Sequence, residues 1–267
     1  MPDFKGKHAI VTGGTQGLGA AIARRLAEDG VTGLVICGRN AENGNAVARS
    51  ISKATGTDVR FVQADLGRVA DCEAVMAEAS RDFGTIDMLV NAAATTARGG
   101  ILDTTPELFD EIFALNTRAP FLLMQSAIRT MLRDGIEGSI LNIASMSAHG
   151  GQSFLTPYSA SKAALVSMTR NVAWSVIAKR IRVNALNIGW MESDQEKALH
   201  AAQGHDEDWF RERSAELPFG RLLQPDEVAR VAAFILSSDS GMMTGSIVDF
   251  DQTILGTRDD LPPPPEL

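Results

Sequence analysis

Three side chains suited to moving a proton lie close together in the chain: Ser145, Tyr158 and Lys162. Tyr158 and Lys162 are four residues apart in a segment of helical composition, so both would lie on one helix face. A phenol has a pKa of about 10, and a neighbouring ammonium favours its deprotonated form. A serine hydroxyl can hold the reacting oxygen. The trio predicts proton transfer at a carbonyl or alcohol oxygen, although this Tyr–Lys spacing alone also occurs on solvated helix faces.

A glycine-rich turn near the start of the chain is the second chemical feature. Gly13, Gly17 and Gly19 lie between a predicted strand at residues 8–12 and a predicted helix at residues 18–28. Glycines let a pyrophosphate approach the backbone, and the helix N-terminus supplies free N–H groups and a positive dipole. We expect a dinucleotide-binding turn here, the alternative being a plain strand-to-helix connection.

Together, the turn Thr12-Gly-Gly-Thr-Gln-Gly-Leu-Gly19 and the set Ser145, Tyr158 and Lys162 resemble the short-chain dehydrogenase/reductase family over nearly the whole chain. The resemblance implies that Tyr158 is a general acid/base and that Ser145 positions the substrate oxygen. It also implies that Lys162 lowers the phenol pKa and binds the nicotinamide ribose. Asn116, within LNTRAPF, would complete a proton relay as the fourth catalytic residue.

The end of the second predicted strand bears on the choice of cofactor. Gly38-Arg39-Asn40 lies about 20 residues past the glycine turn, where an acidic residue would bind the ribose hydroxyls of NAD. No carboxylate is present there to repel a 2′-phosphate, and Arg39 is able to bind one. This favours NADP(H) over NAD(H). Gln16 argues the other way, because many NADP-dependent relatives carry a basic residue there, and Arg39 can also stack on adenine with either cofactor.

Two further stretches match cofactor-binding elements of the family. Asp65 and Leu66 follow the third predicted strand and correspond to its adenine-contacting pair. Asn91 begins the element that follows the fourth strand, where Ala93 and Ala94 depart from the family pattern.

The stretch after the sixth predicted strand departs from the family by one residue. Ile188 replaces the expected proline before Gly189, while Ser193 keeps the expected hydroxyl near the nicotinamide carboxamide. The full set of cofactor contacts implied by the resemblance is Gly13, Thr15, Gln16, Gly17, Leu18, Gly19, Arg39, Asn40, Asp65, Leu66, Asn91, Tyr158, Lys162, Ile188, Gly189 and Ser193.

Substrate identity is less clearly encoded than the chemistry. Polar residues of the loop before Tyr158 suit hydroxyl groups, whereas Met146 and Met191 suit apolar ones. For His149 the alternative is a loop histidine bonded to backbone. We expect a polyol or sugar, with a hydrophobic ketone or a 3-oxoacyl thioester as the alternative. The predicted substrate contacts are Ser145, Ser147, His149, Gln152, Tyr158 and Trp190.

Two segments interrupt the alternation of strands and helices. Residues 190–220 are polar, charged and helical in character, and they follow a strand end where ligands bind in such folds. We expect a lid over the substrate, the alternative being an ordinary surface insertion. The Pro-rich tail at residues 258–267 either docks on a partner subunit or is frayed.

Apolar runs alternating with longer amphipathic stretches predict a doubly wound parallel sheet with helices on both faces, a Rossmann-type single domain at residues 1–257. The predicted strands are 8–12, 34–37, 59–62, 86–90, 139–143, 181–186 and 246–250. The predicted helices are 18–28, 41–53, 69–83, 105–131, 158–179 and 225–236.

Composition and charge exclude several classes of function. The net charge of −8 offers no basic surface for nucleic acid. No apolar run approaches the roughly 20 residues that span a bilayer, and the N-terminus has no signal-peptide pattern. Cys37 and Cys72 have no metal-binding or redox spacing, and His200 and His205 lack a third ligand. We expect a cytoplasmic protein without a metal site and without nucleic-acid or membrane partners.

The sequence therefore predicts an NAD(P)-dependent oxidoreductase that interconverts a secondary alcohol and a ketone. The resemblance also implies a homotetramer. A second hypothesis is a dinucleotide-sensing protein that kept the fold and lost turnover, suggested by the departures at Ala93, Ala94 and Ile188.

Overall fold

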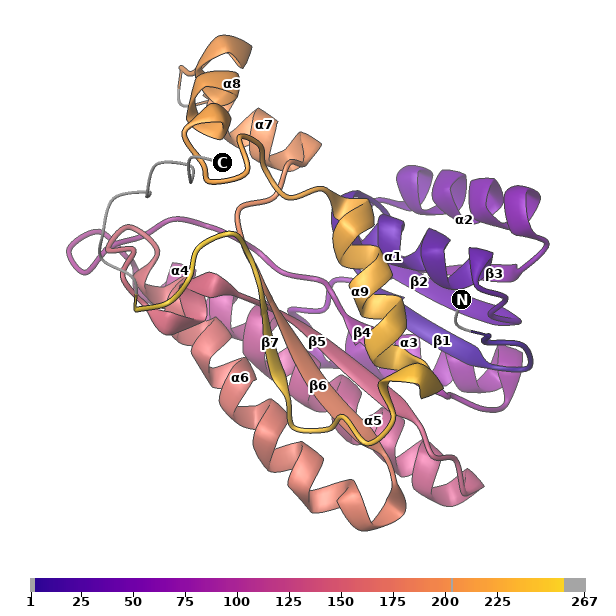
Figure 1. The fold of residues 1–267 in the computed structure, drawn as a ribbon. Helices are drawn as coiled ribbons and strands as arrows, with labels where there is room; N and C mark the ends of the chain where they lie inside the picture. The colour runs from indigo at the N-terminus through magenta and orange to yellow at the C-terminus, as the bar shows by residue number, and fades with distance from the viewer. Residues whose placement is uncertain (1–2, 203, 257–267) are drawn as a thin grey trace, which may run out of the picture.

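The computed structural model describes residues 3–202 and 204–256 and contains a parallel seven-stranded sheet (Figure 1). The strand order is β3-β2-β1-β4-β5-β6-β7. This confirms the predicted doubly wound, Rossmann-type sheet. The strand order reverses between β1 and β4, the position at which such sheets bind ligands beyond their C-terminal edge. The strands are β1 (His8–Thr12), β2 (Gly33–Gly38), β3 (Asp58–Gln63), β4 (Met88–Asn91), β5 (Ser139–Ser145), β6 (Arg182–Ile188) and β7 (Ile247–Phe250).

Helices bury both faces of the sheet, which is why its strands are apolar at successive positions. In β1, Ala9 and Val11 pack into one core and Ile10 into the other, as the two-residue period of a strand requires. The first core is covered by α1 (Gly17–Glu28), α2 (Ala41–Thr55) and α9 (Pro225–Leu236). The second is covered by α3 (Val69–Phe83), α5 (Ala119–Asp134) and α6 (Thr156–Val176).

The prediction of one unbroken helix at residues 105–131 is wrong. The structure divides it into α4 (Pro106–Phe113), a π-helical turn η1 (Ala114–Arg118) and α5. Pro120, at the start of α5, has no amide hydrogen to donate to the carbonyl four residues earlier. That carbonyl belongs to Asn116, so the break in the helical ladder falls on a predicted catalytic residue.

Other predicted boundaries shift by a few residues. The long helix expected to reach residue 179 ends at Val176 and continues as a 3₁₀ turn, η3 (Ile177–Lys179). Strand β6 extends to Ile188, two residues beyond its predicted end. The segment at residues 190–220 forms α7 (Asp194–Ala202) and α8 (Glu207–Ala215), which project beyond the C-terminal edge of the sheet (Figure 1). The tail at residues 258–267 lies outside the described residues.

Arg182, at the start of β6, ties the C-terminal end of α9 to the sheet. Its guanidinium donates to the carbonyls of Ile235, Leu236 and Ser237 at 2.8, 3.0 and 2.9 Å, and to Ser240 Oγ at 2.7 Å. The last carbonyls of a helix have no partners within the helix, so this one side chain satisfies several of them. Burial lowers the pKa of Arg182.

Replacing Arg182 with alanine is predicted to destabilise the fold substantially. The carbonyl of Leu236 would lose its side-chain donor, and those of Ile235 and Ser237 would share only the Ser240 hydroxyl, at a cost of about 3 kcal/mol in the free energy of unfolding. Urea denaturation of wild type and Arg182→Ala measures this cost. The control is Arg60→Ala, because Arg60 forms an exposed pair with Asp58 that contributes less than about 1 kcal/mol. Equal, small losses in both variants would show that Arg182 does not hold α9.

Candidate active site

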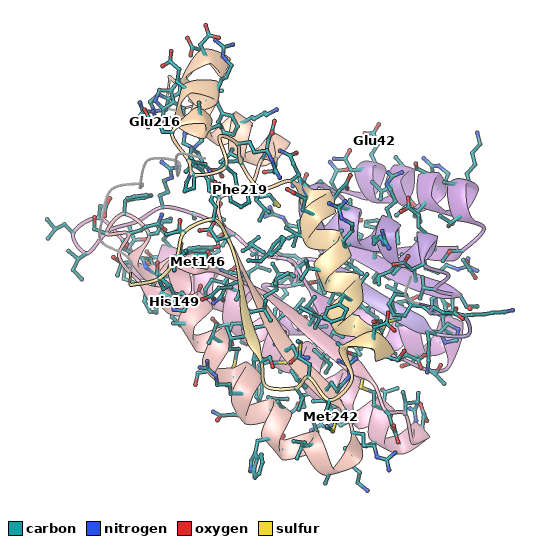
Figure 2. The ribbon with its side chains drawn as sticks, viewed as in Figure 1. Glu42, Met146, His149, Glu216, Phe219 and Met242 are labelled. Carbon is teal, nitrogen blue, oxygen red and sulfur yellow. The ribbon has the colours of Figure 1, made fainter. Side chains whose placement is uncertain are left out.

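A cleft of about 1350 Å³ opens at the C-terminal edge of the sheet. It extends from the glycine turn between β1 and α1, past the ends of β4, β5 and β6, to helices α7 and α8. In Figure 2, Met146 and His149 lie beneath the segment that carries Glu216 and Phe219. Most predicted cofactor residues and all predicted substrate residues share this cavity with the predicted acid/base group.

The structure brings Ser145, Tyr158 and Lys162 together in this cleft. Ser145 is the last residue of β5, while Tyr158 and Lys162 lie one turn apart on α6, and all three are buried. Lys162 Nζ donates to the carbonyl oxygen of Ile143 at 2.8 Å and lies 5.9 Å from the centre of the Tyr158 ring. The helical spacing thus places phenol and ammonium on the same face, as predicted.

The electrostatics of this trio differ from the sequence expectation. Burial raises the pKa of Tyr158, a hydrogen bond with Ser145 lowers it, and the charge of Glu196 raises it further. Burial also lowers the pKa of Lys162 from 10.5 to about 8. We expected Lys162 to lower the phenol pKa, but here desolvation is the larger effect on both groups. At neutral pH Tyr158 is a protonated donor.

Asn116 lies behind the cleft and does not line it. Its side chain is fully buried, with Oδ1 accepting from Thr95 N at 2.9 Å and Nδ2 donating to Ser161 Oγ at 3.1 Å. The side chain therefore positions neighbouring elements. Any contribution of this residue to a relay falls to its backbone carbonyl, which lacks its usual donor because of Pro120.

The glycine turn has the geometry that a pyrophosphate site needs. Gly17 has φ +51° and a side chain there would point into open space, so its backbone is accessible from the cleft. A Cβ on Gly13 would lie 2.9 Å from Ala93 Cα, and one on Gly19 would lie 2.3 Å from the Gly13 carbonyl oxygen. The first turn of α1 contains no acidic residue and is not capped by the side chain of Gln16. These features fit an anionic dinucleotide.

All predicted cofactor residues line the cleft except Asn40 and Asn91. Asn40 instead caps α2, its Oδ1 accepting from Asn43 N at 2.9 Å. Asn91 is buried between strands and donates from Nδ2 to Asn142 Oδ1 at 2.8 Å. Both asparagines therefore support the site from outside the cavity. Arg39 lines the cleft immediately after β2, where the sequence predicted a contact with the ribose substituent.

The departure at Ile188 leaves the end of β6 in place. Ile188 pairs with Phe250 of β7, and Gly189 lies so close to Asp251 that a side chain would overlap its carboxyl group. Ser193 lines the cleft, and its Oγ accepts from Glu196 N at 3.1 Å at the start of α7.

All six predicted substrate residues line the cleft, but four of them are held by other side chains rather than left open: Ser147, His149, Gln152 and Trp190. Ser147 Oγ donates to Gln152 Oε1 at 2.6 Å. His149 Nε2 lies 3.1 Å from Asp249 Oδ1, so its partner is a β7 side chain rather than the backbone.

Helix α7 contributes two residues that sequence reasoning missed. Glu196 and His200 of α7 both line the cleft, and Glu196 Oε1 accepts from Trp190 Nε1 at 2.9 Å and lies 3.1 Å from His200 Nε2. In the sequence analysis, His200 was weighed only as a possible metal ligand. The four-residue spacing of Glu196 and His200 on a helix was the signal that could have identified them.

Among the described residues no group of three or more His, Cys, Asp or Glu side chains could hold a metal ion. Within the same part of the chain, no helix has the length and hydropathy to cross a bilayer. Cys37 and Cys72 are both buried free thiols, and burial raises their pKa values to about 12 and about 11.

Comparisons of the sequence with known proteins match it to reductases and dehydrogenases. A family profile described as enoyl-(acyl carrier protein) reductase matches residues 13–252. The dehydrogenase/reductase SDR family member 4 of Oryctolagus cuniculus is 36% identical over 243 residues, covering 91% of each chain. The 3-oxoacyl-[acyl-carrier-protein] reductase of Chlamydia trachomatis is 31% identical, covering 92% of this chain and 96% of its own.

A similar solved structure extends this agreement to three dimensions. The L-sorbose reductase of Gluconobacter frateurii, complexed with NADPH and L-sorbose, superimposes with a TM-score of 0.90 at 27% identity. The match covers 96% of this chain and 99% of the reductase.

The buried ammonium of Lys162 is predicted to cost stability in a pH-dependent way. Because its folded pKa is about 8, the unfolded chain binds more protons between pH 8 and 10.5, so this destabilisation fades as pH rises. The charge costs roughly 3 kcal/mol at pH 7, and the bond to Ile143 returns about 1 kcal/mol. We expect Lys162→Met to stabilise the fold at pH 7, and the gain to shrink between pH 8 and 10.5.

Urea titrations at several pH values measure this difference, with Lys53→Met, which removes an exposed lysine of α2, as the control for lost charge. A destabilised Lys162→Met protein with no pH-dependent change would contradict the prediction.

Proposed function

Because this chain belongs to the short-chain dehydrogenase/reductase family, an oxidoreductase family that uses NAD(P), we propose that it interconverts a secondary alcohol and a ketone. One observation carries the proposal: Ser145, Tyr158 and Lys162 meet in the same cleft as the glycine turn. A hydroxyl, a protonated phenol and an ammonium in one cleft suit proton transfer to a carbonyl oxygen.

In the reductive direction, the carbonyl oxygen of the substrate accepts hydrogen bonds from Ser145 and Tyr158. The nicotinamide, when bound, supplies the hydride to the carbonyl carbon. Tyr158 gives its proton to the oxygen, which completes the alcohol and leaves a phenolate. Lys162, whose pKa of about 8 lies near physiological pH, stabilises that phenolate and passes a proton back to it. The amine of Lys162 regains its proton from solvent, through a water that the carbonyl of Asn116 would hold.

We assign NADP(H) as the favoured cofactor. Arg39 lines the cleft after β2 and the adjoining Gly38 and Asn40 carry no carboxylate, so the site favours a 2′-phosphate. The L-sorbose reductase neighbour is complexed with NADPH.

We propose a polyol or sugar as the substrate. Ser147, His149 and Gln152 provide polar groups at the substrate end of the cleft, and a similar structure contains L-sorbose. The competing hypothesis is a hydrophobic ketone or a 3-oxoacyl thioester, which the name of the Chlamydia relative favours. Helices α7 and α8 would act as the lid that excludes water from this end.

A dinucleotide sensor without turnover is the less supported alternative. The departures at Ala93, Ala94 and Ile188 leave the cleft formed, and the acid/base side chains are brought together within it. A sensor has no need of that arrangement.

The expected homotetramer and cytoplasmic location stay predictions. Large apolar side chains exposed on one copy of the chain would be covered by others, which supports assembly. Examples are Phe109, Phe121, Trp174, Ile177 and Met242.

The direct test follows reduced-nicotinamide absorbance with a panel of polyols, ketoses, simple secondary alcohols and a 3-oxoacyl thioester, each with both cofactors. Wild type should turn over ketoses or polyols with a higher kcat/KM for the NADP couple. Tyr158→Phe should lower kcat by about a thousandfold, because proton donation contributes on the order of 10²–10⁴, while cofactor affinity is kept.

Turnover of the thioester alone would refute the polyol proposal. Cofactor binding without turnover of any compound would favour the sensor.

A further inference from the structure

The lid brings a negative charge into the substrate half of the cleft. Glu196 lies on the first turns of α7, and its carboxylate is near enough to Tyr158 for its charge to raise the phenol pKa. Its Oε1 is held by the indole N–H of Trp190 and by the imidazole of His200. The carboxylate is therefore positioned by two side chains rather than free to turn toward solvent.

The second oxygen of this carboxylate remains available. Oε2 of Glu196 forms no hydrogen bond with the described residues, although the residue lines the cleft. An ionised carboxylate accepts hydrogen bonds and donates none. The partner that suits Oε2 is thus a donor brought by the ligand, such as a hydroxyl group.

His200 adds a second acceptor beside it. Its side chain lines the cleft, is 8% exposed, and has a buried Nδ1 without a partner in the described part of the chain. With Nε2–H donating to Glu196, the neutral imidazole keeps Nδ1 as a lone-pair acceptor. Trp209 and Trp190 pack against the ring at 4.6 and 5.7 Å between centroids, which fixes its orientation.

Among the described residues, no arginine or lysine forms an ion pair with the Glu196 carboxylate. Asp251, which also lines the cleft, is a second acid. The cations that line the same cleft include Arg98, whose guanidinium carbon lies 5.4 Å from the centre of the Phe154 ring, and Lys162, whose Nζ lies 5.9 Å from the centre of the Tyr158 ring.

We propose that Glu196, positioned by Trp190 and His200, selects neutral polyhydroxylated substrates and excludes anionic ones. A hydroxyl satisfies the carboxylate, whereas a substrate carboxylate or phosphate would bring like charges together where water is excluded. An alkyl chain would leave both acceptors unpaired, which also lowers its affinity. The inference rests on the proposed function because it names the substrate class of that same site.

The charge effect is testable without any turnover. The chain contains three tryptophans, so Trp174→Phe on the exposed face of α6 leaves Trp190 and Trp209 as reporters. In that background, fluorescence quenching by iodide is compared with quenching by neutral acrylamide at constant ionic strength. We expect Glu196→Gln to raise the iodide-to-acrylamide ratio by about twofold. Glu196→Asp and the matched control Glu73→Gln, an exposed acid of α3, should leave it unchanged.

The substrate effect is measured with two probes that differ by one charge: a neutral ketohexose, and the keto acid in which a terminal CH₂OH is a carboxylate. Wild type should prefer the ketohexose in kcat/KM by at least about tenfold, a difference of about 1.4 kcal/mol. Glu196→Gln should bring the ratio close to one by lowering the KM of the keto acid, whereas Glu196→Asp should retain the preference.

The two measurements separate the inference from the proposed function. An unchanged quenching ratio in Glu196→Gln, or an equal change in Glu73→Gln, overturns the role of Glu196 even if sugars are turned over. The role of Glu196 is also overturned if wild type prefers the keto acid and Arg98→Gln abolishes that preference. A raised quenching ratio with no turnover of either probe refutes the polyol proposal and, with it, the hydroxylated substrate class, while supporting anion exclusion.

Discussion

The hydrogen bond between the Lys162 ammonium and the Ile143 carbonyl joins α6 to β5, and the rest of the cleft depends on it. Ser145 lies two residues beyond Ile143 at the strand end, and Tyr158 lies one turn before Lys162 on the helix. This contact, together with the hydrogen bond from Asn142 of β5 to Thr169 of α6, brings hydroxyl, phenol and ammonium together. The parallel sheet makes this possible, because β5 ends at the same edge as the glycine turn after β1.

That arrangement places a charged group and a phenol in largely buried positions that line the cleft. Burial lowers the pKa of Lys162 and raises that of Tyr158. In both groups burial therefore favours the uncharged form over the charged one. Such sites reduce stability in favour of function. Helix α7 adds to this effect, since the negative charge of Glu196 also raises the pKa of Tyr158, by less than burial does.

Features set by local spacing were predictable from the sequence. The strand and helix pattern, the glycine turn and the shared face of Tyr158 and Lys162 follow from periodicity and helical geometry. The division of the helix around Asn116 was missed because it arises from Pro120 acting within an otherwise strongly apolar helical pattern. The pKa direction of Tyr158 was also missed, because burial in a cleft is a tertiary property. The hydrogen bonds of Asn40 and Asn91, which keep both outside the cavity, likewise depend on neighbours that spacing does not reveal.

The segment at residues 190–220 shows the same limit of prediction from sequence. Residues 190–220 were expected to be helical, and α7 and α8 form there. Which of their many charged residues faces the cleft depends on the angle at which α7 meets Trp190, and no local pattern specifies that angle.

Titration of the phenol tests the central claim most directly, because Tyr158 is the only tyrosine of the chain. The near-ultraviolet absorbance of phenolate, followed within milliseconds of a pH jump so that the fold persists, reports this one side chain, with Tyr158→Phe as the blank. A buried, protonated donor requires phenolate to form only above the ordinary pKa of about 10. Phenolate appearing in the free protein below that value would contradict the claim that burial keeps Tyr158 as the acid.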